Sequence, residues 1–331
     1  MSKPSFAIAI MAAGKGTRLK SKYPKVLHEV GGKALLRHVI EAAAKVVPAE
    51  NIYSIIGYEA DRVRQAMGDT GTKFILQEEQ RGTGHAIMCG RNALSKYDHI
   101  LVLSGDTPLI RPEIIERLRD YHLQSHASMT LLTAVPLDPF GFGRIVRKSV
   151  SGAQSGEVAA IVEQKSLSPD QLNLPEINVG IYGFATKPLY ANIDKLSTDN
   201  AHKEYYLTDM AELLGRAGEK VIALKAGEMA ETLGINSRPE LVRLDAQVRA
   251  AKALQLMEAG VTIYKPETCT IDADVEIGPD TIIEPFVQLL GKTKIGSDCR
   301  IRSGSVSEPK YILVTRSGTR CSAWVTRSNA R

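Results

Sequence analysis

The sequence predicts an α/β protein in which a doubly wound, mostly parallel sheet is followed by a short parallel β-helix. Apolar runs of strand length alternate with helical patterns through the first 125 residues. This alternation is typical of parallel sheets with crossover helices. Beyond residue 262, a branched apolar residue recurs every six positions. A six-residue period of this kind is typical of parallel β-helices.

The predicted sheet begins with four strands, each followed by a helix. The apolar runs that predict the strands span residues 6–11, 52–57, 73–77 and 99–106. Helical spacing of apolar residues predicts helices over residues 34–47, 60–68, 82–94 and 111–123. Pro112 falls in the first turn of the last helix, a position that proline favours.

The middle of the chain is punctuated by glycine and proline and has a different pattern. We interpret its strand-like runs as a mixed-sheet extension over the carboxyl edge of the first sheet; they span 129–137, 142–148, 157–165 and 177–186. Two further helices are predicted over 203–217 and 239–259. The second ends at Gly260, and its expected apolar face consists of Leu241, Leu244, Val248 and Ala251.

The six-residue period predicts the third part of the chain. The recurring apolar residues are Ile271, Ile277, Ile283, Leu289, Ile295 and Ile301. In a β-helix each hexapeptide forms one flat side, and its apolar residue points inward. The pattern is lost at Ser307, where a Ser-, Thr- and Arg-rich segment begins. We therefore expect a sheet domain over 1–238, a linking helix over 239–260, the start of a β-helix over 261–306 and an irregular basic tail over 307–331.

The distribution of charge argues against nucleic-acid binding. Residues 307–331 supply +4 of the net charge of +5, and a basic tail is not a basic groove. The four cysteines form no C-x-x-C pair, and we interpret them as reduced structural thiols. No apolar run approaches the roughly 20 residues of a membrane span, and the N-terminus lacks a signal-peptide pattern. These features predict a cytoplasmic protein without a membrane partner.

A glycine-rich loop follows the first predicted strand. Residues 14–18 lack the Walker sequence, and Leu19 replaces the third glycine of the dinucleotide fingerprint. One interpretation is a nucleotidyltransferase loop, whose backbone N–H groups wrap a triphosphate while Arg18 and Lys25 neutralise its charge. The other is a plain glycine turn with solvated basic residues, since short glycine motifs are weak signals.

Two later segments favour a nucleotide site. Gln77 ends a predicted strand, and its side chain offers a donor and an acceptor, as does the pairing edge of uracil. Gly82 and Thr83 follow at the start of a helix. Asp106 lies just beyond an apolar strand, at the edge where doubly wound sheets bind ligands, and a carboxylate there suits Mg²⁺. Each residue alone also fits a surface loop, a turn or a helix cap.

Taken in order, these segments resemble the sugar-nucleotide pyrophosphorylases, and most closely the bifunctional N-acetylglucosamine-1-phosphate uridyltransferase/glucosamine-1-phosphate acetyltransferase (GlmU-type) family. The resemblance covers residues 6–303 and rests on A-A-G-x-G-T-R-x6-P-K, Q-x-E-Q-x-G-T-x-H-A, G-D-x-P-L, GFGRI, IVEQK, EINVGIY, GIN and the hexapeptides. Met11 stands where an aliphatic residue is more usual. The resemblance implies a Rossmann-like nucleotidyltransferase domain over 1–238 and only the start of a left-handed β-helix.

The resemblance also implies roles for individual residues. Contacts to uridine and substrate are implied at Ala12, Ala13, Gly14, Gln77, Gly82, Thr83, Ser104 and Gly105. Sugar contacts are implied at Gly143, Glu163 and Asn178. The catalytic cations would be Arg18 and Lys25, and the metal ligands Asp106 and Asn236. On their own, Glu163, Asn178 and Asn236 would pass for surface or loop residues.

The implied reaction is Mg²⁺-dependent transfer of a uridylyl group from UTP to N-acetylglucosamine 1-phosphate, giving UDP-N-acetylglucosamine and pyrophosphate. Two alternatives stay open: a pyrophosphorylase for another sugar phosphate or nucleotide, and a non-catalytic sugar-nucleotide-binding subunit. The presence of Arg18, Lys25 and Asp106 favours the enzyme. Full-length members of the family are trimers, but two predicted coils offer little surface for assembly. We therefore expect a weak or absent trimer and no acetyl transfer.

Overall fold

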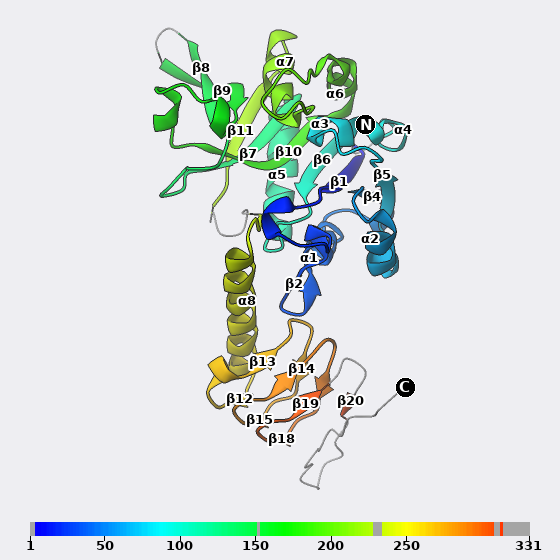
Figure 1. Ribbon diagram of the computed structural model, residues 1–331, viewed down its shortest axis with the longest axis vertical. Coiled ribbons are helices and arrows are strands. Elements are labelled where there is room, and N and C mark those ends of the chain that lie inside the picture. Colours follow the sequence, from blue (N-terminus) through cyan, green and yellow to red (C-terminus); the bar gives the residue numbers. More distant parts are fainter. Residues whose placement is uncertain (1–3, 151–152, 228–233, 308–311, 314–331) are drawn as a thin grey trace. The chain divides into compact units, whose positions relative to one another are not determined.

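The computed structural model describes residues 4–150, 153–227, 234–307 and 312–313 (Figure 1). The chain divides into two compact units. The first runs to Leu27 and then from Leu35 to Ile235, and the second holds His28–Ala34 and the chain from Asn236 onward. Within the described ranges, no helix combines the length and the apolar character that crossing a membrane requires.

The first unit is built on a nine-stranded sheet with the order β5-β4-β1-β6-β10-β7-β11-β9-β8. Its strands are β1 Phe6–Ala12, β4 Ile52–Ile56, β5 Lys73–Leu76, β6 His99–Ser104, β7 Met129–Ala134, β8 Arg144–Val150, β9 Ala153–Val162, β10 Ile177–Ala185 and β11 Val221–Lys225. The four strands predicted first, β1, β4, β5 and β6, pair in parallel. Their carboxyl ends therefore meet at one edge.

The rest of this sheet corrects the prediction of a mostly parallel sheet. β10 runs antiparallel to β6 and β7, and β9 runs antiparallel to β8 and β11. Only two residues separate β8 from β9, and strands so close in sequence pair antiparallel. The predicted extension thus continues the same sheet and makes it mixed.

Helices cover both faces of the sheet. They are α1 Leu35–Ala43, α2 Ala60–Met67, α3 Thr83–Cys89, α4 Arg91–Leu94, α5 Pro112–Gln124, α6 Thr186–Asn192 and α7 Met210–Arg216. Ala7 and Ala9 belong to an apolar cluster with residues of α3, α4, α6 and α7. Successive strand side chains point to opposite faces. The buried Ile8 and Ile10 therefore face the other side, where α1 packs on β1 and α5 packs on β7 and β10.

Some helices differ from the prediction. The helix predicted over 82–94 is divided at Gly90 into α3 and α4. The one predicted over 203–217 begins with a short 3-10 turn at Leu207–Asp209 and continues as α7. Helix α6 and the hairpin of β2 Glu29–Val30 and β3 Lys33–Ala34 were not predicted. These elements are short, so their apolar period is too brief to stand out.

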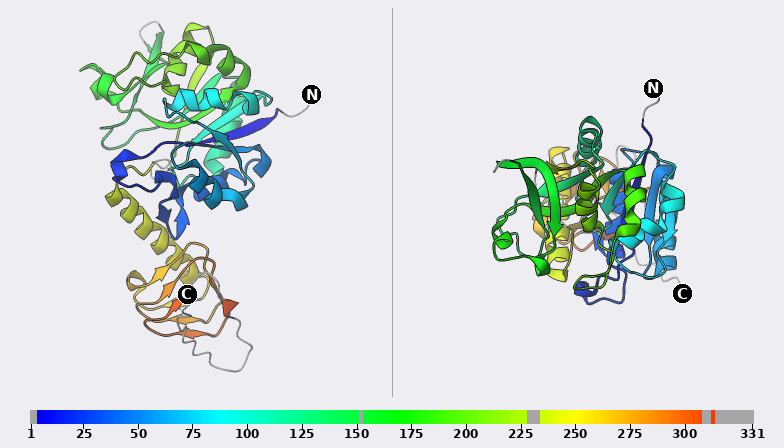
Figure 2. Two further views of the ribbon diagram at one scale, coloured as in Figure 1. Left: turned by 45° about the vertical axis from the view of Figure 1, so that its right-hand side comes forward. Right: turned by 90° about the horizontal axis from the view of Figure 1, so that it is seen from above.

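The second unit contains a parallel β-helix of three short sheets (Figures 1 and 2). The sheets are β12-β15-β18, β13-β16-β19 and β14-β17-β20. Their strands are β12 Thr262–Ile263, β13 Thr270–Ile271, β14 Glu276–Ile277, β15 Ile282–Ile283, β16 Gln288–Leu289, β17 Lys294–Ile295, β18 Arg300–Ile301, β19 Val306–Ser307 and β20 Ile312–Leu313. Ile271 pairs with Leu289, so one coil takes three hexapeptides.

The inward row of this β-helix follows the predicted period. Ile271, Ile283, Leu289, Ile295 and Ile301 are buried, and Ile277 is half-buried against the same core. Helix α8, Arg238–Glu258, adds its own buried residues to this core, namely Ala253 and Leu256.

The face predicted for α8 is not the one that enters this core. Ala251 is exposed, Leu241, Leu244 and Val248 are half-buried, and the middle of the helix makes polar contacts. Asp245 accepts a hydrogen bond from the Gly31 N–H at 2.7 Å, and Arg249 pairs with Asp245 and Asp272. Only the last turns of the helix therefore bury apolar side chains.

The β-helix continues past the predicted limit at residue 306. Ser307 lies in β19 and is buried, and its Oγ is 2.8 Å from Thr293 Oγ1. Leu313 of β20 pairs with Ile295. The inward position is held by a hydrogen-bonded serine and not by an apolar residue, so the six-residue period did not predict this continuation. The rest of the predicted tail, 308–311 and 314–331, lies outside the described residues, and the other predicted domain limits stay predictions.

Candidate nucleotide-binding site

The glycine-rich loop leaves the sheet at Ala12 and contains two short 3-10 helices, Thr17–Leu19 and Lys25–Leu27. Gly16 has a φ of +67°, and a Cβ at this position would lie 2.5 Å from the Cβ of Lys25. A side chain would therefore clash where the loop folds back on itself. Glycine at position 16 allows the loop to bring its two predicted catalytic cations to the same edge of the sheet.

The Lys25 ammonium forms an ion pair with Asp106 Oδ2. Asp106 follows β6, whose neighbour β1 leads into the loop. The Ile235 N–H donates to the Asp106 backbone carbonyl at 3.0 Å. A Cβ at Gly234 would lie 2.9 Å from Asp106 Oδ1, so the chain closes tightly over this carboxylate. The two ionic side chains remain 14% and 22% exposed, which leaves them within reach of a ligand.

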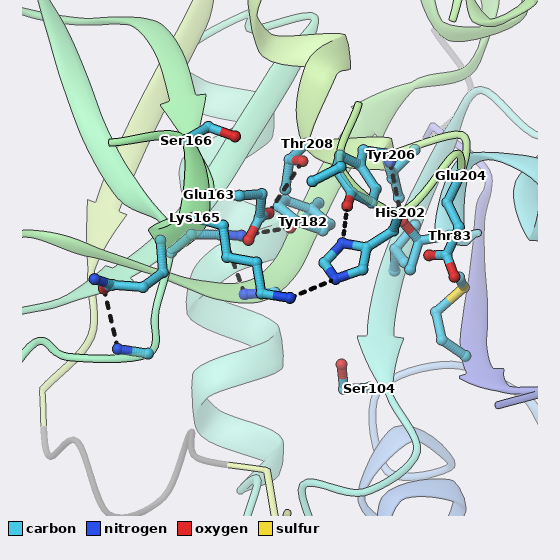
Figure 3. A pocket seen from close by; sticks show the side chains of 18 of the residues that line it. Thr83, Ser104, Glu163, Lys165, Ser166, Tyr182, His202, Glu204, Tyr206 and Thr208 are labelled. Carbon is cyan, nitrogen blue, oxygen red and sulfur yellow. Dashed lines mark hydrogen bonds between the residues drawn. The ribbon is translucent and has the colours of Figure 1, made fainter. Parts of the chain in front are cut away.

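A cavity of about 770 Å³ opens beside this edge (Figure 3). Its walls come from β1, β6, β10, the segment after β9 and the 201–208 segment. Five of the predicted site residues line it: Arg18, Thr83, Ser104, Glu163 and Asn178. These residues lie far apart in the sequence, so the fold gathers them into one site.

The other predicted substrate residues are not among those that line the cavity, but several border it. Gly105 donates its N–H to the Met11 carbonyl at 3.0 Å, and Met11 lines the cavity. The Gly143 carbonyl accepts from the Asn178 N–H at 2.9 Å. Ala12 and Ala13 are buried at the end of β1, and Gly14 is exposed beyond them.

Gln77 and its segment lie at the same carboxyl edge. The Gln77 N–H donates to the Ile56 carbonyl at 2.8 Å, and the Tyr58 N–H donates to the Ala13 carbonyl at 3.0 Å. The buried Gln77 side chain donates from Nε2 to the Gly82 carbonyl at 3.0 Å. The backbone of this segment therefore joins the ends of β1, β4 and β5.

Thr83 connects this segment to the cavity. Its Oγ1 accepts a hydrogen bond from the Leu207 N–H at 2.9 Å. Both residues line the cavity. Helix α3 and the 201–208 segment are thus held together at the wall where a ligand would lie.

Glu163 and Asn178 form a second wall with fixed side chains. Asn178 donates from Nδ2 to Tyr182 Oη at 2.8 Å and accepts from the Gly180 N–H at 3.1 Å. Glu163 accepts from Thr208 Oγ1 at 3.3 Å. Burial raises the pKa of the Glu163 carboxyl, and the Thr208 hydrogen bond and the nearby His202 ring partly offset this effect.

Sequence reasoning missed a chain of polar side chains on the cavity wall. Lys165 Nζ lies 3.1 Å from His202 Nε2, and His202 Nδ1 contacts Tyr206 Oη (Figure 3). An ammonium can only donate, so His202 accepts at Nε2 and donates from Nδ1. Lys165 and His202 are 37 positions apart, and no short motif could have joined them.

A further acid lies behind this wall. Burial, together with the negative charges of Glu163 and Glu212, raises the pKa of Asp209 to about 6. Asp209 lies immediately before α7 and directly after Thr208, the hydrogen-bond donor to Glu163. Two carboxyl groups with raised pKa values therefore share one region of the site.

The two residues predicted to bind the metal ion belong to different units. Asp106 belongs to the first unit and Asn236 to the second. The Asn236 N–H donates to Glu240 Oε2 at 2.7 Å at the start of α8. Among the described residues, no group of three or more His, Cys, Asp and Glu side chains is arranged to hold a metal ion. The pairing of Asp106 with Asn236 stays a prediction.

Comparison with known proteins tests the predicted family. Residues 8–167 match the MobA-like NTP transferase domain, and residues 274–306 match the bacterial transferase hexapeptide (six repeats). The bifunctional protein GlmU of Koribacter versatilis is 62% identical over 301 residues, which is 91% of this chain. The bifunctional protein GlmU of Solibacter usitatus is 47% identical over 300 residues, or 90% of the chain.

The chain is a relative of the GlmU proteins. The resemblance predicted from the motifs is thereby confirmed. The chain spans 64% of the length of the K. versatilis GlmU and 63% of that of the S. usitatus GlmU.

Solved structures show the fold that this GlmU relative shares with other proteins. A UDP-glucose pyrophosphorylase complexed with UDP-glucose has a TM-score of 0.57 and 14% identity, and the match covers 75% of this chain and 100% of that one. A CMP:2-keto-3-deoxy-manno-octonic acid synthetase complexed with CTP has a TM-score of 0.54 and 19% identity, with 77% and 99% covered. At these identities, the likeness is one of fold.

Proposed function

We propose that this GlmU relative transfers a uridylyl group from UTP to N-acetylglucosamine 1-phosphate and releases pyrophosphate. The observation that carries the proposal is the cavity at the carboxyl edge of the sheet, lined by Arg18, Thr83, Ser104, Glu163 and Asn178. Doubly wound folds bind ligands at this edge. The ion pair of Lys25 with Asp106 adds a cation and a carboxylate at the same edge. The family match adds further support.

The proposed chemistry needs no general base. A phosphate oxygen of the sugar phosphate is ionised at neutral pH and can attack the α-phosphorus of UTP in line, so that pyrophosphate leaves. Most of the rate enhancement must then come from positioning and from neutralising charge. In this proposal Lys25 stabilises the α-phosphate and Arg18 the departing pyrophosphate. The loop backbone around Gly14 would cradle the same phosphates.

We further propose Mg²⁺ as the cofactor, held by Asp106 and Asn236. The donors fit a hard cation, because Mg²⁺ is commonly bound by one or two protein oxygens together with substrate phosphates. The Asp106 carboxylate is partly exposed at the ligand-binding edge, and Lys25 already contacts one of its oxygens. When bound, the metal ion would supply positive charge to the phosphates. Lys25 would then remain beside the Asp106 carboxylate and the phosphates, held by the loop that Gly16 shapes.

The sugar would lie against the wall that holds Glu163 and Asn178. Both side chains are already oriented by hydrogen bonds, to Thr208 and Tyr182 respectively. Preorganised polar groups lose little entropy when they bind a hydroxyl or an amide. Ala12, Ala13, Gln77, Gly82 and Thr83 would contact the uridine.

Pyrophosphate release tests the proposal directly. UTP with Mg²⁺ would be supplied to the purified chain together with N-acetylglucosamine 1-phosphate, glucosamine 1-phosphate or glucose 1-phosphate, and each reaction repeated with dTTP and CTP. We expect the highest kcat/KM with UTP and N-acetylglucosamine 1-phosphate. Preference for another pair would identify a different pyrophosphorylase. Tight binding of UDP-N-acetylglucosamine without turnover would identify the chain as a binding subunit.

The remaining expectations stay predictions. They are the left hand of the β-helix, a weak or absent trimer, the lack of acetyl transfer and a cytoplasmic location. Sedimentation of the purified chain, beside a thiol-release assay with acetyl-CoA and glucosamine 1-phosphate, would test the second and third.

A further inference from the structure

The Gln77 side-chain amide is held by two neighbours. Its Nε2 lies 3.0 Å from the Gly82 carbonyl oxygen and 3.1 Å from His85 Nδ1. A carbonyl can only accept, so the group that faces Gly82 must be the NH₂ end of the amide. The second amide hydrogen is then directed at the His85 ring.

The surroundings of His85 fix its ring and its tautomer. Because the Gln77 NH₂ group donates, Nδ1 must accept, and the ring hydrogen lies on Nε2. His85 Nε2 is 3.8 Å from Cys89 Sγ, one turn further along α3, and sulfur can accept a weak hydrogen bond. The ring also stacks with Tyr205 at a centroid distance of 6.3 Å and an interplanar angle of 29°.

This arrangement leaves one polar atom of the Gln77 side chain for a ligand. Both amide hydrogens are engaged, so only Oε1 remains. Oε1 accepts no hydrogen bond from a described residue, and it is not among the fully buried side-chain atoms that lack a partner. The sequence suggested that Gln77 could offer a base both a donor and an acceptor. In the structure, only the acceptor, Oε1, is available to a base.

We infer that His85 is a positioning residue that, together with the Gly82 carbonyl, holds the Gln77 amide so that the nucleobase meets only an oxygen. This inference rests on the proposed function and concerns which nucleotide the site prefers. Uracil carries a donor N–H at N3, whereas cytosine carries a lone pair there. An acceptor held opposite N3 therefore favours uracil, because cytosine could pair with it only through the N4 amino group in a shifted position, and a site built for one hydrogen-bond pattern rejects a base that leaves it unpaired.

The inference is tested by replacing His85 and comparing two nucleotides. His85→Phe keeps an aromatic ring against Tyr205 and removes the acceptor. His85→Asn keeps an acceptor, its Oδ1, close to the position of Nδ1. Cys89→Ser is the matched control, because its hydroxyl can still accept from His85 Nε2 and the contact between Gln77 and His85 stays intact. UTP and CTP binding would be measured by calorimetry for each variant, and pyrophosphate release alongside.

We expect His85→Phe to lower the UTP-to-CTP affinity ratio by about three- to tenfold, the scale of one neutral hydrogen bond. His85→Asn and Cys89→Ser should keep the wild-type ratio, and the KM for the sugar phosphate should not change in any variant. The ratio does not depend on the folded fraction, so partial instability would not distort it. If His85→Phe does not fold, His85→Leu replaces it in the same comparison.

Two results would overturn the inference: an unchanged ratio in His85→Phe, or an equal loss of affinity for both nucleotides, which would indicate a merely structural role. Wild-type protein that prefers UTP in binding but releases no pyrophosphate would overturn the proposed function alone. Wild-type protein that binds neither nucleotide would overturn both.

Discussion

The Lys25 ammonium and the Asp106 carboxylate form an ion pair at the carboxyl edge of the sheet. Lys25 comes from the loop after β1, and Asp106 follows β6. These strands are parallel neighbours, so their carboxyl ends lie side by side. The pair places Lys25, which we propose binds the phosphates, in direct contact with Asp106, which we propose binds the metal ion. Four predictions concern this site and its surroundings.

Removing the loop cations should slow the chemical step. Lys25→Ala and Arg18→Ala should each lower kcat by roughly 100-fold or more with a smaller change in KM, because charge develops on the phosphates in the transition state. Steady-state pyrophosphate release measures the effect. Lys22→Ala, an exposed lysine of the same loop, is the control and should behave as wild type. Near-normal kcat in either variant would remove that residue from the mechanism.

Activity should require Mg²⁺ and disappear when the ion is chelated. Asp106→Ala should lose metal-dependent turnover, whereas Asp106→Asn should retain part of it, since an amide oxygen can still bind a hard cation. The measurement is pyrophosphate release as a function of Mg²⁺ concentration. Asp120→Asn, on the exposed side of α5, serves as the matched control. Full activity in excess EDTA would contradict the metal assignment.

The wall of Glu163 and Asn178 should govern affinity for the sugar. Replacing either residue by Ala leaves polar groups of the bound sugar unpaired, at a cost of about 1–3 kcal/mol. The KM for N-acetylglucosamine 1-phosphate should rise accordingly, with that for UTP little changed. Glu157→Ala, in β9 before Glu163 and ion-paired with Lys148, is the control. An equal rise in both KM values would show that the residues do not contact the sugar.

The raised pKa of Asp209 should make stability depend on pH. The folded-state pKa of about 6 lies above the ordinary value of an aspartate, so the folded protein favours the protonated form. The stabilising contribution of protonated Asp209 is complete below about pH 4 and is lost as the pH rises through 6. Above pH 7, Asp209→Asn should therefore raise the free energy of unfolding by on the order of 1–2 kcal/mol.

Urea unfolding of wild type and Asp209→Asn at pH 4.5 and pH 8 measures this difference. The gain should shrink towards zero at the lower pH, where wild-type Asp209 is largely protonated in the folded state. Asp120→Asn, on the exposed side of α5, controls for the loss of a charge. A gain of equal size at both pH values would show that burial of the Asp209 charge is not its cause.

Much of this fold could be predicted from local pattern. The strands β1, β4, β5 and β6 lie within a few residues of their predicted positions, because each is an apolar run of strand length bounded by turn residues. The hexapeptide period likewise predicted the inward row from Ile271 to Ile301. Ser307 escaped detection because its hydrogen bond to Thr293 satisfies a polar group at an apolar position, and a pattern of residue types cannot show such pairing.

The sequence by itself determined the four leading strands, the hexapeptide repeat and the glycine-rich loop, because these depend on neighbours along the chain. Tertiary structure alone decided the antiparallel insertion of β10, the chain from Lys165 through His202 to Tyr206, and the direction of the Gln77 amide. Each of these depends on groups that are distant in sequence and are brought within hydrogen-bonding range only when the sheet and its edge loops fold. The reach of a hydrogen bond is about 3 Å, so its partners are set by the folded backbone and not by spacing in the sequence.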